Sequence, residues 1–118
     1  MRIDKPWGHE LIWAKTDKYV GKVLHIEAGT KLSLQYHRVK DEAIYVMSGR
    51  MELQIGSDSD AETVILEPGQ YRRIAPGTVH RMVALTTCDV LEVSTPELDD
   101  VVRLADEYGR AQRSPSGV

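Results

Sequence analysis

The sequence predicts an all-β fold, in which short antiparallel strands form a closed barrel or two packed layers. Two observations support this prediction. Short runs rich in Val, Ile, Leu and Tyr recur at regular spacing, and turn signals such as Pro68-Gly69 separate them. Within several runs, apolar and polar residues alternate, which is the period of a strand with one buried face. We therefore expect one β domain.

The expected strands follow one another along most of the chain. Residues 5–10 read as an extended arm, because Pro6 disfavours helix before it and Gly8 permits a bend. Strand runs are then expected at residues 11–13, 19–27, 33–37, 42–49, 51–55, 63–66, 71–74, 82–85 and 90–93.

The residues after the last strand change period. Apolar side chains recur there at helical spacing, and Asp99 and Asp100 stand early, where the helix dipole favours acids. The apolar positions are Leu98, Val101, Val102, Leu104 and Ala105. We expect a short C-terminal helix packed outside the barrel, a single domain over residues 1–112 and a flexible, polar tail over residues 113–118.

Length and charge exclude several classes of protein. A chain of 118 residues is long enough for one domain with a substantial core and too short for two ordinary ones. Its formal net charge of −3 gives no electrostatic reason to bind nucleic acid or an anionic membrane. No apolar run reaches the roughly 18 residues of a membrane span. The start, MRIDKPWGHE, lacks a signal peptide's apolar core, and Cys88 has no partner for an internal disulfide, so we expect a cytoplasmic protein.

Potential metal ligands gather in residues 29–49, GTKLSLQYHRVKDEAIYVMSG. Side chains alternate along a strand, so Ser33, Gln35 and His37 share one face. Glu42 then opens the next run, whose Ile, Tyr and Val favour extended chain. Three potential donors therefore converge, which a helix would not achieve with Gln35 and His37 two residues apart.

The spacing of these residues resembles the two motifs of the cupin superfamily. The matching positions are Gly29, Gln35, His37, Glu42 and Gly49 in the first motif, and Gly69, Pro76, Gly77 and His80 in the second. Gln35 replaces the first His of the family pattern, while Ala75 and Ala84 replace a usual Pro and a frequent Asn. Neither alanine removes a metal donor. The resemblance implies a double-stranded β-helix, the jelly-roll barrel of the cupins.

A metal site requires donors of suitable chemistry. Imidazole nitrogens and a carboxylate bind divalent ions, whereas a Gln carbonyl is a weaker donor. Two His and one Glu leave positions open for water or substrate oxygens, as at a catalytic ion. Each side chain alone could be a hydrogen-bonded core residue, but four matches favour a metal bound by His37, Glu42, His80 and Gln35. We expect zinc, with iron, manganese, nickel or cobalt as alternatives.

Three further segments, two of them near the ends of the chain, narrow the resemblance to one group of cupins. Lys-Pro-Trp-Gly at residues 5–8, Ser-Leu-Gln-Tyr-His at residues 33–37 and the run at residues 99–110 resemble the cupin domain of type II mannose-6-phosphate isomerases. The resemblance extends from about Lys5 to Arg110. Those domains usually form the C-terminal part of bifunctional enzymes that also carry a mannose-1-phosphate guanylyltransferase. The resemblance implies that this chain interconverts mannose 6-phosphate and fructose 6-phosphate by metal-assisted proton transfer.

Such a reaction passes through a cis-enediol and needs a base, together with cations for the phosphate. Glu92, where the family carries a Glu in its last core strand, is the first candidate for the base, and Lys22 is the second. Glu92 could equally be a solvated strand residue. Candidate substrate-binding residues are Lys22, Lys31, Ser33, Arg73 and Arg103. Each cation could instead be an ordinary surface charge, and only one of Arg72 and Arg73 can face the pocket.

Departures from the family leave the substrate open. Ala43 and Ile44 follow Glu42 where the family has His-Trp, and Ile44 should face the pocket and change its shape. A non-heme metal dioxygenase is an alternative, because two His and a carboxylate also suit ferrous iron. A non-catalytic sugar-binding or regulatory cupin is another. The partners we expect are a small-molecule substrate, a sugar phosphate, and a second copy in a homodimer, as is common among cupins.

Overall fold

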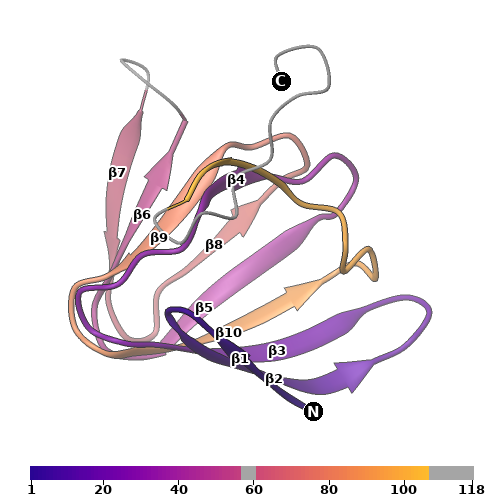
Figure 1. Cartoon of the computed structure of the whole chain (residues 1–118), viewed down its shortest axis with the longest axis horizontal. Coiled ribbons are helices and arrows are strands. Elements are labelled where there is room, and N and C mark those ends of the chain that lie inside the picture. The colour runs from indigo at the N-terminus through magenta and orange to yellow at the C-terminus, as the bar shows by residue number, and fades with distance from the viewer. Residues whose placement is uncertain (57–60, 107–118) are drawn as a thin grey trace.

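The computed structural model describes residues 1–56 and 61–106, which form two antiparallel sheets that face each other (Figure 1). One sheet has the order β1 (Arg2–Lys5), β2 (Gly8–Lys15), β3 (Val20–Ile26), β10 (Cys88–Ser94), β5 (Glu42–Ser48) and β8 (Tyr71–Ile74). The other has the order β11 (Val102–Ala105), β4 (Leu34–Tyr36), β9 (His80–Ala84), β6 (Met51–Ile55) and β7 (Glu62–Leu66). The predicted all-β class is confirmed.

The inward faces of the central strands change from apolar to charged along their length. In the six-stranded sheet, Val90 of β10 lies between Leu24 of β3 and Val46 of β5, and all three are buried. Two residues further along β10, on the same face, Glu92 lies opposite Lys22. The apolar part packs against the five-stranded sheet to form the core, as facing sheets do. The charged part is left to line a cavity at the other end of the strands.

The residues before β2 form β1 and a tight turn, in place of the predicted extended arm, and Lys5 pairs with Gly8. This residue has φ of +151°, and a Cβ there would run into the carbonyl oxygen of His25 on the paired strand. The turn is fixed by a hydrogen bond of 2.9 Å from the Glu27 amide to the Trp7 carbonyl. Trp7 is consequently buried, with 3% of its surface exposed, and joins the core cluster. The turn therefore places Trp7 in the core, where it also lines the cavity.

The predicted C-terminal helix is wrong over the described residues. Val102–Ala105 form β11, which pairs with β4 so that Val102 lies opposite Tyr36 and Arg103 opposite Gln35. The apolar spacing was compatible with a helix, but pairing with an open sheet edge satisfies the backbone groups of this short run. Residues from 107 onward, including the predicted boundary at 112 and the tail at 113–118, lie outside the described residues. In the described ranges we find no helix long and apolar enough to cross a bilayer.

Candidate metal centre

Three predicted ligands converge at the edge of the core. His37 directly follows β4, Glu42 opens β5, and His80 opens β9. One ligand atom from each lies within 4.8 Å of the other two, and all three residues are buried. Glu42 Oε1 is 2.8 Å from His37 Nε2 and 3.4 Å from His80 Nε2. The turns that start β5 and β9 thus bring residues distant in sequence to one point.

The outer ring nitrogens fix the orientation of both imidazoles. His37 Nδ1 lies 2.6 Å from the Asp100 carbonyl oxygen, and His80 Nδ1 lies 2.9 Å from that of Thr78. A carbonyl only accepts, so each Nδ1 carries the hydrogen and donates it. In the neutral rings, each Nε2 lone pair then points toward the Glu42 carboxylate.

This arrangement fits a divalent metal ion. Three acceptor atoms converge in a buried space, and His80 Nε2 has no hydrogen-bond partner there. Burial alone would raise the pKa of Glu42, but its close contacts with the rings of His37 and His80 and the Lys40 charge hold it well below its usual value. Burial also opposes charge on His37, yet its pKa is raised by the Glu42 carboxylate. The site therefore favours a positive charge at its centre, which a bound metal ion would supply.

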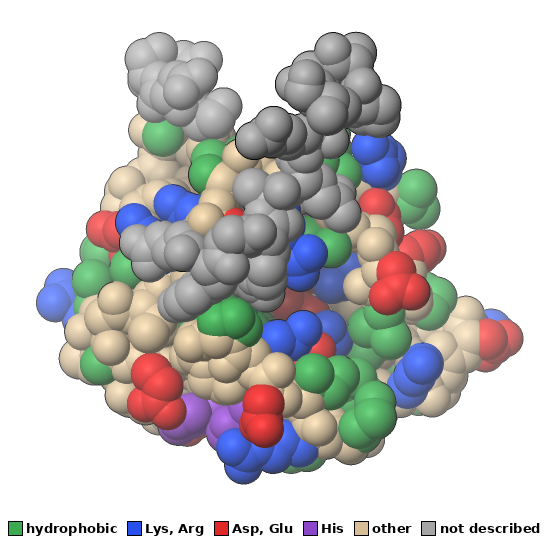
Figure 2. All heavy atoms as spheres, in the orientation of Figure 1, with side chains coloured by type: hydrophobic (Ala, Val, Ile, Leu, Met, Phe, Trp, Pro, Cys, Tyr) green, Lys and Arg blue, Asp and Glu red, His purple; other side chains and the backbone are tan. Residues whose placement is uncertain are grey.

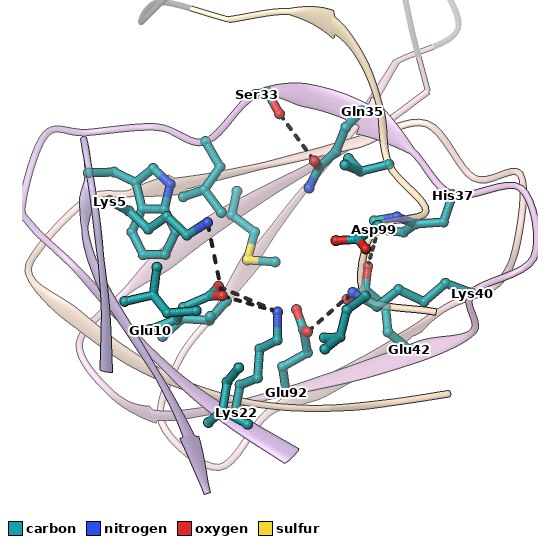
Figure 3. Close-up of a pocket in the computed structure, with 18 of the residues that line it drawn as sticks. Lys5, Glu10, Lys22, Ser33, Gln35, His37, Lys40, Glu42, Glu92 and Asp99 are labelled. Atoms are coloured by element: carbon teal, nitrogen blue, oxygen red, sulfur yellow. Dashed lines mark hydrogen bonds and ion pairs between the residues drawn. The ribbon is translucent and has the colours of Figure 1, made fainter. Parts of the chain in front are cut away.

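Gln35 lies beside this group. It is the register partner of His80 across β4 and β9, and it lines the adjacent cavity. Its side-chain oxygen accepts a hydrogen bond of 3.1 Å from the Ser33 hydroxyl (Figure 3). Its role as a fourth ligand stays a prediction.

A cavity of about 450 Å³ is lined by two of the three residues, His37 and Glu42. Figure 2 shows a recess on this face, with Lys and Arg side chains around it and acidic side chains inside it. The charged side chains of its wall point toward one another across the space (Figure 3). The charged and polar lining residues are Lys5, Glu10, Lys15, Lys22, Ser33, Gln35, His37, Lys40, Glu42, Glu92, Asp99 and Arg103.

The structure brings some of the predicted substrate-binding residues to this cavity and not others. Lys22, Ser33 and Arg103 line it, whereas Lys31 and Arg73 do not. Arg73 lies on the outer face of the sheet, where its guanidinium pairs with Asp41 at 2.7 Å. Its neighbour Ile74 takes the inward position of β8. Lys31 forms an isolated bridge with Val83. Ile44 faces inward as predicted, but it packs in the core rather than on the cavity wall.

Glu92 has the environment of a carboxyl group poised near neutrality. It is 5% exposed, and Lys40 Nζ lies 3.5 Å from its Oε2. Burial, followed by the neighbouring Glu42 charge, raises the pKa of Glu92 to about 7, against the opposing charges of Lys40 and Lys22. A group that changes protonation near neutral pH can both take up and release a proton there.

Sequence reasoning missed several residues of the site. Lys40 is buried and lies 3.8 Å from Glu42 as well as beside Glu92, and Glu10 pairs with Lys22. Asp100 accepts backbone hydrogen bonds from Arg38, Val39 and Lys40 at 2.7 to 3.0 Å. Glu10 has the same strand parity as Ile12, and this alternation could have predicted that both side chains lie on one face of the strand. Lys40 and Asp100 lie in loops, where alternation gives no direction.

Comparison with known proteins decides the family. Residues 22–94 match the family model described as "Cupin domain". The chain belongs to the cupin family. Its two sheets form the double-stranded β-helix of that family, which confirms the predicted fold.

The curated relatives are longer than this chain. The chain is 31% identical over 113 residues to "Mannose-1-phosphate guanylyltransferase" of Escherichia coli (strain K12), covering 92% of the chain and 23% of the relative. It is 30% identical over 114 residues to "Xanthan biosynthesis protein XanB" of Xanthomonas campestris pv. campestris (strain B100), covering 92% and 24%. The chain thus spans about a quarter of the length of these relatives.

Solved structures share the fold at low identity. KdgF from Halomonas sp. has a TM-score of 0.75 at 24% identity, over 85% of this cupin and 91% of that chain. An RmlC-like cupin from Shewanella frigidimarina NCIMB 400 has a TM-score of 0.74 at 17% identity, over 85% and 86%. These likenesses support the architecture alone.

Proposed function

We propose that this cupin is a metal-dependent isomerase that interconverts mannose 6-phosphate and fructose 6-phosphate, with zinc as its metal. The observation that carries the proposal is the buried His37, Glu42 and His80 group beside a charged cavity of about 450 Å³. A cavity of this size accommodates a monosaccharide phosphate. The relative named mannose-1-phosphate guanylyltransferase supports a mannose-derived substrate.

The chain's own side chains supply the proton transfer in this proposal. A bound divalent ion would polarise the sugar carbonyl and stabilise the charge that develops on its oxygen. Glu92 takes the proton from one carbon of the substrate and returns it to the neighbouring carbon, with the cis-enediol between the two steps. Lys40 Nζ lies 3.5 Å from Glu92 Oε2 and orients this carboxylate. Lys22 is the second candidate for the base.

Metal analysis followed by an activity panel tests this function. Protein purified without chelator should contain about one transition-metal ion per chain, and the double variant His37→Ala/His80→Ala should lose it. The metal-loaded protein should interconvert aldose and ketose phosphates, while the double variant should not. Lys18→Ala, at an exposed loop position, is the matched control. Turnover of no sugar phosphate with any of zinc, manganese, iron, cobalt or nickel would contradict the proposal.

Two His and one carboxylate also suit ferrous iron and oxygen chemistry, so a dioxygenase is the second candidate. Oxygen dependence separates the two functions, because an isomerase works with zinc under anaerobic conditions. A non-catalytic sugar-binding cupin would bind the ligand and exchange no proton with solvent.

We also propose a cytoplasmic location. Cys88 is buried and is the chain's single cysteine, so it closes no internal disulfide. Cell fractionation tests this, and recovery of the protein outside the cytoplasm would contradict it.

A further inference from the structure

A second group of charged side chains lies on the cavity wall across from the metal centre (Figure 3). It consists of Lys5 at the end of β1, Glu10 in β2 and Lys22 in β3. The Lys22 ammonium lies 3.4 and 3.5 Å from the two Glu10 carboxylate oxygens, and the Lys5 ammonium lies 4.0 Å from one of them. The side chains of Glu10 and Lys22 are each only 10% exposed. These three residues are the Lys5–Glu10–Lys22 cluster.

The ion pairs of this cluster are loose. Close charge-assisted hydrogen bonds between an ammonium and a carboxylate measure about 2.7–2.9 Å, and all three contacts here are longer. Each ammonium has three N–H donors, so Lys5 and Lys22 together offer six. The single Glu10 carboxylate that they share cannot accept hydrogen bonds from all six. Buried charges are costly unless they are well paired. The two ammonium groups thus keep donors for a further acceptor in the cavity that they line.

The cavity wall carries a small excess of positive side chains. Its lining includes five Lys and Arg residues against four Glu and Asp residues, although the chain has a formal net charge of −3. Cations gathered in a recess with low-dielectric walls attract anionic ligands. A neutral ligand would use the hydrogen-bonding capacity but not the charge.

We propose that Lys5 and Lys22 bind an anionic oxygen group of the ligand, a phosphate or a carboxylate, at the end of the cavity away from the metal centre. Glu10 shares the same ammonium groups and so competes with that anion. The ligand is then a monosaccharide acid or phosphate, with its reacting oxygens toward His37 and its anionic group toward Lys5. That the ligand is a monosaccharide derivative in this orientation rests on the proposed function, whereas the anion site at Lys5 and Lys22 does not.

Isothermal titration calorimetry of the zinc-loaded protein tests the proposal with mannose, mannose 6-phosphate and mannuronate. The three probes share one ring and differ in the group at C6. At least one anionic probe should bind about tenfold or more tightly than mannose. Which of the two does so distinguishes phosphate from carboxylate. Equal affinity for all three probes would overturn the proposal.

Three variants are expected to change the affinity for the anion in opposite directions, which a general loss of structure would not produce. Lys5→Met and Lys22→Met should each weaken binding of the preferred anion by about tenfold and leave mannose binding unchanged. Glu10→Gln should tighten anion binding, because it removes the competing carboxylate and keeps both ammonium groups. Lys18→Met, outside this cavity, should change nothing. Weaker anion binding in Glu10→Gln, or none of these changes in the lysine variants, would contradict the proposal.

Binding also separates this inference from the isomerase function. Anion binding that depends on Lys5 and Lys22, without any isomerisation, would overturn the function and support the anion site. Isomerisation that proceeds unchanged in both lysine variants would support the function and overturn the anion site.

Discussion

Glu92 is the residue on which proton transfer depends in the proposed mechanism. As a base it must be ionised, and burial raises its pKa to about 7. A divalent ion beside Glu42 favours the charged form, so kcat/KM should rise with pH to a plateau, with its midpoint at or below about 7. Glu92→Gln should lower kcat roughly 10²- to 10⁴-fold and retain substrate binding. A wild-type pH profile in the Gln variant would assign the base elsewhere, with Lys22 next to be tested.

Asp100 holds the loop between two of the proposed metal ligands, His37 and Glu42. Its carboxylate accepts backbone hydrogen bonds from residues 38–40, which lower its pKa to about 2, and its carbonyl oxygen accepts the His37 Nδ1 hydrogen. Asp100→Ala should therefore weaken zinc binding by about 10- to 100-fold. Competition with a chromogenic chelator measures this. Exposed Asp17→Ala is the control, and equal zinc affinity in both variants would show that the loop holds its shape without the carboxylate.

The same carboxylate makes stability depend on pH. Its pKa is lower in the folded chain than the roughly 3.9 of an unfolded Asp. The stabilisation is therefore present above about pH 4 and is lost as the pH falls toward 2. Asp100→Asn should flatten the stability profile in that interval, as measured by denaturant unfolding. A profile that keeps the wild-type slope would mean that other carboxylates dominate there.

At the scale of elements, β11 closes the edge of the five-stranded sheet beside β4. A chain that ends at Val101 keeps Asp100 and loses the strand, together with the 3.1 Å hydrogen bond from Arg81 to the Ala105 carbonyl. Its melting temperature should fall by several degrees, as a loss of about 1 kcal/mol produces in a domain of this size. A chain that ends at residue 112 is the control and should melt like the full chain. An unchanged melt for the shorter chain would mean that β11 adds no stability.

The central strands could be predicted from the sequence because their alternation is strong. In β3 and β10 the buried residues Leu24 and Val90 recur with period two, which also places Lys22 and Glu92 on the inward face. The run Val102–Ala105 carried no comparable signal. Four residues are too few to separate helix from strand by periodicity, and an open edge beside β4 decided the outcome.

The residues of the candidate site also divide into those that could be predicted from the sequence and those that could not. The motif spacing singled out His37, Glu42 and His80 as candidates, and the structure brings them together. Arg73 could have been set aside because Ile74 must take the inward position of β8. Lys40 and Asp100 could not be placed from the sequence. Their orientation depends on how two distant loops meet, which no local pattern encodes.

At the scale of the whole molecule, an apolar row crosses the outer face of the six-stranded sheet. The strand registers align Leu11, Val23, Leu91, Tyr45 and Tyr71 across five strands. The exposed fractions of Leu11, Tyr45 and Tyr71 are 42%, 42% and 75%. The row that contains Asp89 lies on one side of it, and the row that ends in Arg73 lies on the other. Exposed apolar surface of this extent is typical of an interaction site.

We expect a second copy of the chain on this face, because a two-fold axis along the row brings the Asp89 side of one copy over the Arg73 side of the other. Leu91→Glu should then convert a dimer to a monomer, as measured by light scattering after size exclusion. Val39→Glu, at an exposed apolar position outside both sheets, is the control. A monomeric wild-type protein at micromolar concentration would contradict this expectation.

The most direct test of the isomerase account is proton exchange at carbon. Zinc-loaded protein is incubated anaerobically with fructose 6-phosphate in heavy water, and the products are analysed by NMR and mass spectrometry. Transfer through an enediol exposes the moving proton to solvent, so mannose 6-phosphate should appear with deuterium at C2, and His80→Ala should yield none. Neither interconversion nor deuterium incorporation with any of the candidate metals would contradict the account.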